Sequence, residues 1–188
     1  MKIALIVLAA GLSRRFQQQA GGQKLLADLD GKPVLQRTLE QAAASGLDRF
    51  VVIRPDASAL KALCCGATLV MCDSGGLGES IAAGVRASRH YDGWLIALGD
   101  MPFVTPESYR AVGQALAEAS IVRPWIDGRP GHPVGFQRHC YSLLSTLQGD
   151  AGPQATVSAA AVRLPLQDRG CLYDIDLPAD LHLIKEFS

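Results

Sequence analysis

Short runs of apolar residues alternate along the chain with segments in which apolar residues recur every three or four positions. The runs have the length and β-branched content of buried strands, and the segments between them have the period of amphipathic helices. Strands are predicted at residues 3–8, 49–53, 68–72, 94–98, 121–125, 134–137 and 162–166. This alternation predicts an α/β fold built on a mostly parallel sheet.

Local turn and cap signals refine this outline. Thr105 is predicted to cap a helix that has Pro106 at its first position, and the glycine-rich stretch 73–78 is predicted to be a loop. Strands 121–125 and 134–137 flank an Asp127-Gly128 turn, which predicts antiparallel pairing in the C-terminal third. No repeat or linker divides the chain, so residues 1–188 are expected to form one domain.

Composition narrows the class of protein. The formal charge is zero at neutral pH, which argues against a general nucleic-acid binder. The five cysteines include no Cys-x-x-Cys pair, which is typical of a reduced, cytoplasmic protein. The apolar run 3–10 after Lys2 could be compared with a signal peptide, but it is short, meets Arg14-Arg15 and is better explained as the first strand. No apolar segment approaches the roughly 20 residues of a membrane span.

Three irregular segments, 9–24, 73–80 and 99–104, follow predicted strands. Ligands of open α/β sheets bind beyond the carboxyl ends of the strands, so these segments are expected to form one site. In the first segment, the small residues of Ala9-Ala10-Gly11 allow close approach of the backbone to an anion, and Arg14 and Lys24 can neutralise phosphates. When this segment is considered alone, an ordinary turn with solvated basic residues is the favoured interpretation. The standard P-loop and dinucleotide-binding glycine patterns are absent.

Carboxylates and one histidine add further candidates. Asp100 ends an apolar strand, where it either caps the Met101-Pro102 turn or holds a magnesium ion on triphosphate oxygens. Asp174 and Asp176 bracket Ile175 and point to one face, although Asp176 could instead cap the following helix. His132, after a turn, is expected to be exposed and either structural or a donor to a phosphate or ring carbonyl.

Taken together, these segments resemble the molybdopterin cytidylyltransferases, a branch of the family that includes molybdenum cofactor guanylyltransferase. The resemblance covers nearly the whole chain. The motifs that carry it are Leu8-Ala9-Ala10-Gly11-Leu12-Ser13-Arg14-Arg15 with Lys24, Ser80 after the glycine loop, Leu98-Gly99-Asp100-Met101-Pro102, Pro130-Gly131-His132-Pro133-Val134, Gly149-Asp150 and Asp174-Ile175-Asp176.

The resemblance implies a three-layer, Rossmann-like nucleotidyltransferase fold with an antiparallel C-terminal strand region. It implies that residues 8–13, Gly75 and Ser80 bind the nucleotide. Arg14 and Lys24 would hold its phosphates, and Asp100 and Asp176 would bind Mg²⁺. Gly131, His132 and Pro133 would contact the acceptor.

The implied reaction is attack of a molybdopterin phosphate on the α-phosphorus of CTP, with release of pyrophosphate. The Ala-Ala-Gly turn and the Gly-His-Pro segment resemble the cytidylyl branch, which implies CTP and hand-over of the product to a molybdenum hydroxylase of the xanthine dehydrogenase type. The alternatives are the same chemistry with GTP, a sugar-phosphate or alcohol-phosphate acceptor, and a non-catalytic nucleotide-binding or cofactor-binding protein.

Two departures from the family pattern bear on the site. The insertion of residues 17–20 separates the arginines from Lys24 and is expected to place the lysine on a more mobile loop. Leu177 stands where the family has threonine, which removes a hydroxyl next to Asp176.

Overall fold

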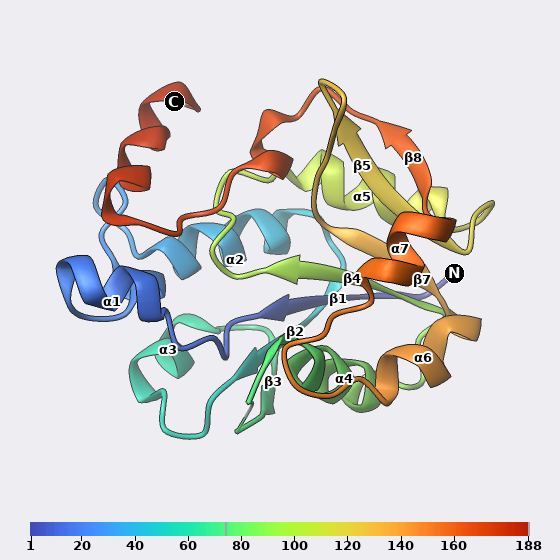
Figure 1. Cartoon of the computed structure of the whole chain (residues 1–188), viewed down its shortest axis with the longest axis horizontal. Coiled ribbons are helices and arrows are strands. Elements are labelled where there is room, and N and C mark those ends of the chain that lie inside the picture. Colours follow the sequence, from blue (N-terminus) through green and yellow to red (C-terminus); the bar gives the residue numbers. More distant parts are fainter. Residues whose placement is uncertain (74, 188) are drawn as a thin grey trace.

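One mixed sheet runs through the computed structural model, which describes residues 1–73 and 75–187, with Arg14 described by its backbone alone (Figure 1). Its strands are β1 (Ile3–Leu8), β2 (Asp48–Ile53), β3 (Thr68–Met71), β4 (Gly93–Leu98), β5 (Ile121–Ile126), β6 (Arg129–Pro130), β7 (Val134–Gln137) and β8 (Val162–Pro165). Their order is β3-β2-β1-β4-β7-β5-β6, and β8 lies beside β5.

Helices cover both faces of this sheet. They are α1 (Arg14–Ala20), α2 (Val34–Ala44), α3 (Ser58–Leu63), α4 (Leu77–Ala87), α5 (Pro106–Ala115), α6 (Tyr141–Ser145) and α7 (Gln154–Ala160), with 3₁₀ turns η1 (Lys24–Leu26), η2 (Arg138–Cys140), η3 (Arg169–Leu172) and η4 (Pro178–Glu186). In Figure 1, α2 and α5 lie on one side of the sheet and α4 and α6 on the other. No helix of the described residues is both long and apolar enough to cross a membrane.

The side chains of β1 divide the core into two layers. Leu5 and Val7 pack with the apolar residues of α2, α3 and α5, whereas Ala4 and Ile6 pack with those of α4, α6 and α7. Successive side chains of a strand point to opposite faces, so an apolar run without polar interruption fits a strand that is covered on both sides. The three-layer arrangement predicted from the sequence is therefore confirmed.

Strand directions bring the predicted loops together. β1 pairs in parallel with β2 and with β4, and Leu8 lies opposite both Val52 and Leu98. The loops after these strands consequently leave the same edge of the sheet. β7 is antiparallel to both β4 and β5, which confirms the antiparallel C-terminal region.

Three local expectations need correction. The partner of β5 across the Asp127-Gly128 turn is the short strand β6, and β7 pairs with β5 on its other side. Helix α4 begins at Leu77, inside the stretch predicted to be a loop. Residues 17–20 belong to helix α1, and Lys24, which was expected on a loop, begins the 3₁₀ turn η1. Helix α1 lies against η4 near the C-terminus (Figure 1).

Candidate active site

A cavity of about 380 Å³ opens at the carboxyl edge of the sheet, where the loops after β1 and β3 meet. Most of its lining comes from residues 8–16 and 75–80, which include these two loops, and the rest comes from Lys24, Asp150 and Asp176. The residues are Leu8, Ala10, Gly11, Leu12, Ser13, Arg15, Phe16, Lys24, Gly75, Gly76, Leu77, Ser80, Asp150 and Asp176. The structure thus gathers most of the predicted nucleotide-binding residues around one space.

Ala9 is the exception in the first loop. Its backbone N–H donates to the carbonyl oxygen of Val52 at 2.8 Å, so the strand geometry continues one residue beyond β1. The alternation therefore also continues, and the methyl group of Ala9 packs in the core layer on the face opposite Ala10. Ala9 was expected to bind the nucleotide together with residues 8–13, but its side chain faces the core and does not line the cavity.

Helix α1 contains Arg14 and Arg15 and is followed by a turn that leads the chain back toward Lys24. Ser13 precedes it in the left-handed conformation (φ 51°), with its hydroxyl buried and without a hydrogen-bond partner among the described residues. Gly21 and Gly22, with φ of 69° and 70°, then turn the chain back toward η1. The predicted phosphate ligand Arg14 starts this helix, but its side chain lies outside the described part of the chain.

Lys24 sits between the two predicted metal ligands. Its Nζ lies 2.6 Å from Oδ2 of Asp100 and 3.2 Å from Oδ1 of Asp176. The Lys24 and Asp100 side chains are 13% and 15% exposed, so this ion pair is largely shielded from water. Three segments far apart in the sequence therefore meet in one charge cluster.

Within this cluster, each charged side chain shifts the pKa of its partners toward the charged form. Burial opposes the charge on Lys24, but attraction and a hydrogen bond from Asp100 prevail and hold the lysine pKa above its ordinary value. Burial raises the pKa of Asp100, and Lys24 opposes that shift. Burial acts in the same direction on Asp176, yet hydrogen bonds from Arg15 and Lys24 outweigh it and lower the pKa of that carboxyl group.

The donor set fits a metal that also binds substrate. Oδ1 of Asp100 is buried without a hydrogen-bond partner among the described residues, so it has an unused lone pair at the site. Within residues 1–73 and 75–187, no group of three or more histidine, cysteine or acidic side chains could hold a metal ion. One or two carboxylates completed by phosphate oxygens and water is the usual environment of Mg²⁺ at a triphosphate. Asp100 and Asp176 fit that environment.

The loop after β3 forms the opposite wall of the cavity. A Cβ atom on Gly76 would lie 2.3 Å from the carbonyl carbon of Gly149, so the backbones of these two loops approach more closely than a side chain allows. The N–H of Gly78 donates to the carbonyl oxygen of Gly149 at 2.8 Å and fixes the contact. This contact places Asp150 beside Gly75 and Ser80 in the lining.

The predicted acceptor segment lies deeper than expected. His132 is half-buried, whereas the sequence interpretation placed it on the surface. Gly131 and Pro133 are buried and do not line this cavity. The backbone N–H of His132 donates to the carbonyl oxygen of Cys171 at 2.9 Å. This residue of η3 covers the segment, a long-range contact that a local turn pattern does not reveal.

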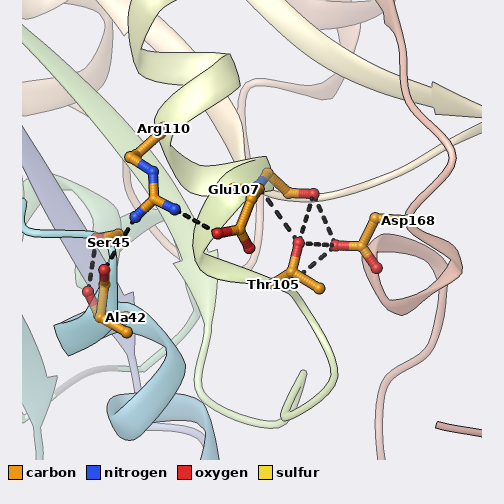
Figure 2. A network of polar contacts seen from close by, with 8 residues as sticks. Ala42, Ser45, Thr105, Glu107, Arg110 and Asp168 are labelled. Atoms are coloured by element: carbon orange, nitrogen blue, oxygen red, sulfur yellow. Dashed lines mark hydrogen bonds and ion pairs between the residues drawn. The ribbon is translucent and has the colours of Figure 1, made fainter.

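Asp168 holds the segment that carries Asp176. Its Oδ2 accepts hydrogen bonds from the N–H and hydroxyl of Thr105, both 2.9 Å, and from the hydroxyl of Ser108 at 2.7 Å (Figure 2). Arg110, which pairs with Glu107, donates to the carbonyl oxygen of Ala44 at 2.9 Å, so α5 is also tied to α2. These contacts connect α5, α2 and the start of η3, and they hold the segment that leads to Asp176 in place.

Several site residues were missed by the sequence interpretation. Arg15 donates from Nη1 to Oδ2 of Asp176 at 2.6 Å and lines the cavity, although its neighbour Arg14 was expected to be the phosphate ligand. Phe16, Gly76, Leu77 and Asp150 also line the cavity. Their positions next to predicted site residues were the available signal.

Comparisons with known proteins show the family of the chain. The sequence model of the family described as "MobA-like NTP transferase domain" matches residues 5–164. A probable molybdenum cofactor guanylyltransferase of Pyrococcus horikoshii is 32% identical, and the match covers 98% of this chain and 100% of that protein. A bifunctional protein GlmU of Roseobacter denitrificans is 30% identical over 65% of this chain, which spans 28% of GlmU's length.

A solved structure shows the same fold over the full length. The crystal structure of Rv0371c from Mycobacterium tuberculosis in complex with manganese superposes with a TM-score of 0.83. It is 25% identical in sequence, and the match covers 100% of both chains. In that structure, Rv0371c is in complex with manganese.

Proposed function

The chain belongs to the family of MobA-like NTP transferase domains and is a nucleotidyltransferase, and on that premise we propose that its acceptor is the phosphate of a molybdopterin-type molecule. The observation that carries the proposal is the meeting of Lys24, Asp100 and Asp176 beside the cavity under the glycine-containing loops. The name of the full-length Pyrococcus relative supports molybdopterin as the acceptor.

In the proposed reaction an oxygen of the acceptor phosphate attacks the α-phosphorus of a nucleoside triphosphate. A P–O bond forms there, the bond to the bridging oxygen of the β-phosphate breaks, and pyrophosphate leaves. Because the acceptor phosphate is already ionised at neutral pH, no general base is required. Catalysis then depends on bringing two anions together and neutralising their charge.

The residues of the cluster divide this work. Asp100 and Asp176 would hold a divalent cation, proposed as Mg²⁺, whose chemistry is neutralisation of charge on phosphate oxygens. Arg15 and Lys24 lie at the same end of the cavity and would bind the phosphates that leave as pyrophosphate. Arg14 is proposed for the same role on the sequence resemblance.

Two nucleotides have support as the donor. The Pyrococcus relative is named a guanylyltransferase, and relatives of this name match nearly the whole of this chain, which favours GTP over the CTP predicted from the sequence. CTP remains the second candidate because Ala10 lines the cavity and its Ala-Ala-Gly turn resembles the cytidylyl branch, whereas the guanylyl branch is similar to Ala-Gly-Gly. Hand-over to a xanthine dehydrogenase-type hydroxylase was inferred together with the cytidylyl reaction and depends on it.

Pyrophosphate release tests the proposal. The purified protein is incubated with Mg²⁺ and either GTP or CTP, with molybdopterin, with a sugar phosphate or with no acceptor, and Asp100→Asn serves as the inactive control. We expect release that requires molybdopterin and is faster with one nucleotide; Ala10→Gly should shift that preference toward GTP. Release with a sugar phosphate alone would assign another acceptor. Nucleotide binding without release under any condition would refute catalysis.

A further inference from the structure

A second, smaller cavity of about 80 Å³ adjoins the cavity of the candidate active site, which we call the nucleotide cavity, and Leu8 and Leu77 line both. We call it the side cavity. Apart from Arg123, His132 and Gln154, the residues that line it are apolar. In binding sites of this kind, which are apolar with a few converging polar groups, the polar groups fix the orientation of the ligand and provide specificity.

Arg123 brings an unneutralised positive charge to the side cavity. It extends from β5, and its Nε donates to the carbonyl oxygen of Gly131 at 3.0 Å, which orients the guanidinium group. Across residues 1–73 and 75–187, Arg123 forms no ion pair. Burial lowers its pKa, with no carboxylate to oppose the shift. A half-buried guanidinium of this kind gains from an acceptor that a ligand supplies.

His132 brings an unused acceptor. Burial, and secondarily the charge of Arg123, lowers its pKa to about 4, so the imidazole is neutral near pH 7. A hydrogen bond to the backbone of Ile96 partly opposes that shift, while Nδ1 is buried without a partner among the described residues. The bond to Ile96 therefore engages Nε2–H, which leaves the lone pair of Nδ1 free to accept a hydrogen bond.

We propose that Arg123 and His132 select a ligand with a lactam edge, in which a carbonyl oxygen stands next to a ring N–H. The carbonyl oxygen accepts from the guanidinium of Arg123, and the ring N–H donates to Nδ1 of His132. The small volume admits the edge of a ring, and the remainder of the ligand lies toward the nucleotide cavity across Leu8 and Leu77. This inference rests on the proposed function, because it specifies how that site recognises its substrate.

Two substrates of the proposed reaction carry such an edge. The pterin ring of the acceptor has it, and so does guanine, whereas cytosine does not. The bond from Arg123 to Gly131, which belongs to the segment predicted to contact the acceptor, favours the pterin. Binding measurements in the absence of turnover show whether the pterin or guanine carries the recognised edge. They do so whether or not the protein catalyses the proposed reaction.

The first experiment uses the intrinsic fluorescence of 6-hydroxymethylpterin to measure its binding to the purified protein in the absence of nucleotide. The comparison ligand is 2,4-diamino-6-hydroxymethylpteridine, in which an amino group replaces the carbonyl and an unprotonated nitrogen replaces the N–H. We expect the pterin to bind about tenfold or more tightly than the diamino compound, because both hydrogen bonds are reversed in the latter. Equal affinity, or no binding of either ligand, overturns the proposal.

The second experiment compares Arg123→Met and His132→Phe with the matched control Arg163→Met. Arg163 lies opposite Arg123 on the neighbouring strand β8, packs over the ring of Trp125 and does not line the side cavity. Each cavity variant should weaken pterin binding about tenfold or more and leave CTP binding unchanged. Weaker GTP binding with unchanged pterin binding would assign the lactam edge to guanine. Affinities equal to those of Arg163→Met for all three ligands overturn the proposal.

These readouts are independent of catalysis. Selective pterin binding without pyrophosphate release would refute the proposed function and leave the recognition intact. Pyrophosphate release that is as efficient in Arg123→Met as in the unmodified protein, at all acceptor concentrations, would refute the recognition and leave the function intact.

Discussion

Replacing Lys24 by methionine tests whether the charge cluster is a coupled unit. The substitution removes the ammonium group that lies 2.6 Å from Asp100 and 3.2 Å from Asp176 and keeps a side chain of similar length. Packing should change little, since methionine adapts readily to irregular space. The remaining effect is electrostatic: the Asp100 carboxylate stays buried without its counter-charge, and Asp176 keeps Arg15.

The expected cost follows from burial. Removing one partner of a buried ion pair typically destabilises a protein by about 3–5 kcal/mol. The side chains of Lys24 and Asp100 retain 13% and 15% exposure, so the lower end of that range, about 3 kcal/mol, is expected. For a protein of this size, that loss lowers the melting temperature by roughly 6–12 °C.

Thermal and urea unfolding followed by circular dichroism measure this loss. Lys32→Met is the matched control, because Lys32 pairs with Glu40 at 2.8 Å while both side chains are almost half exposed. It should cost about 1 kcal/mol or less. Adding Asp100→Asn to Lys24→Met should restore most of the lost stability, because no buried charge is then left unpaired.

Divalent cations extend the same test to metal binding. Without the ammonium group, Mn²⁺ or Mg²⁺ can supply the missing positive charge, so either ion should raise the melting temperature of Lys24→Met more than that of the unmodified protein. Equal unfolding midpoints for Lys24→Met and Lys32→Met would refute the reasoning. So would a double variant that is less stable than Lys24→Met alone.

Three further outcomes follow from the site. Asp100→Asn should reduce pyrophosphate release about 100-fold or more with an unchanged circular dichroism spectrum; turnover like that of the unmodified protein would contradict the assignment. Gly76→Ala should weaken nucleotide binding about tenfold, because its Cβ would meet the Gly149 backbone at 2.3 Å, whereas Gly113→Ala, with only a 4.0 Å contact, should leave titrations unchanged. The neutral form of His132 is favoured by folding, so its contribution is complete above pH 6.5 and is lost as pH falls toward 4. Between pH 6.5 and pH 4, the free energy of unfolding in urea should therefore fall by up to about 3 kcal/mol less in His132→Phe than in the unmodified protein. Parallel curves of this free energy against pH for the two proteins would contradict the prediction.

The sequence was sufficient to predict which loops converge. Apolar runs such as 3–8 require burial on both faces, burial requires helices on both sides, and parallel strands then end at one edge. The opposite positions of Leu8 and Leu98 place the glycine turn and Asp100 at that edge. The same alternation, continued past the strand, could have placed Ala9 in the core and Ala10 in the cavity.

The partners within the site could not be predicted in this way. Whether Lys24 reaches Asp100 depends on the path of residues 17–20, which form helix α1, and on the turn at Gly21 and Gly22. The depth of His132 depends on η3, which meets it only in the folded chain. Local patterns specify elements, whereas these contacts are set by packing between elements far apart in the sequence.

The departure at Leu177 shows how the fold preserves the site without the family's threonine. A threonine before Pro178 could cap η4 with its hydroxyl, but leucine has no acceptor to offer. In this chain Oδ2 of Asp180, which lies within η4, accepts hydrogen bonds from the N–H groups of Asp176 and Leu177, at 2.9 and 2.7 Å. These bonds fix the start of the turn. The N–H of Ile175 meanwhile donates to the carbonyl oxygen of Asp100 at 2.8 Å. The backbone thus fixes Asp176 next to Asp100, and the Asp176 carboxylate remains available to Lys24 and to a metal ion.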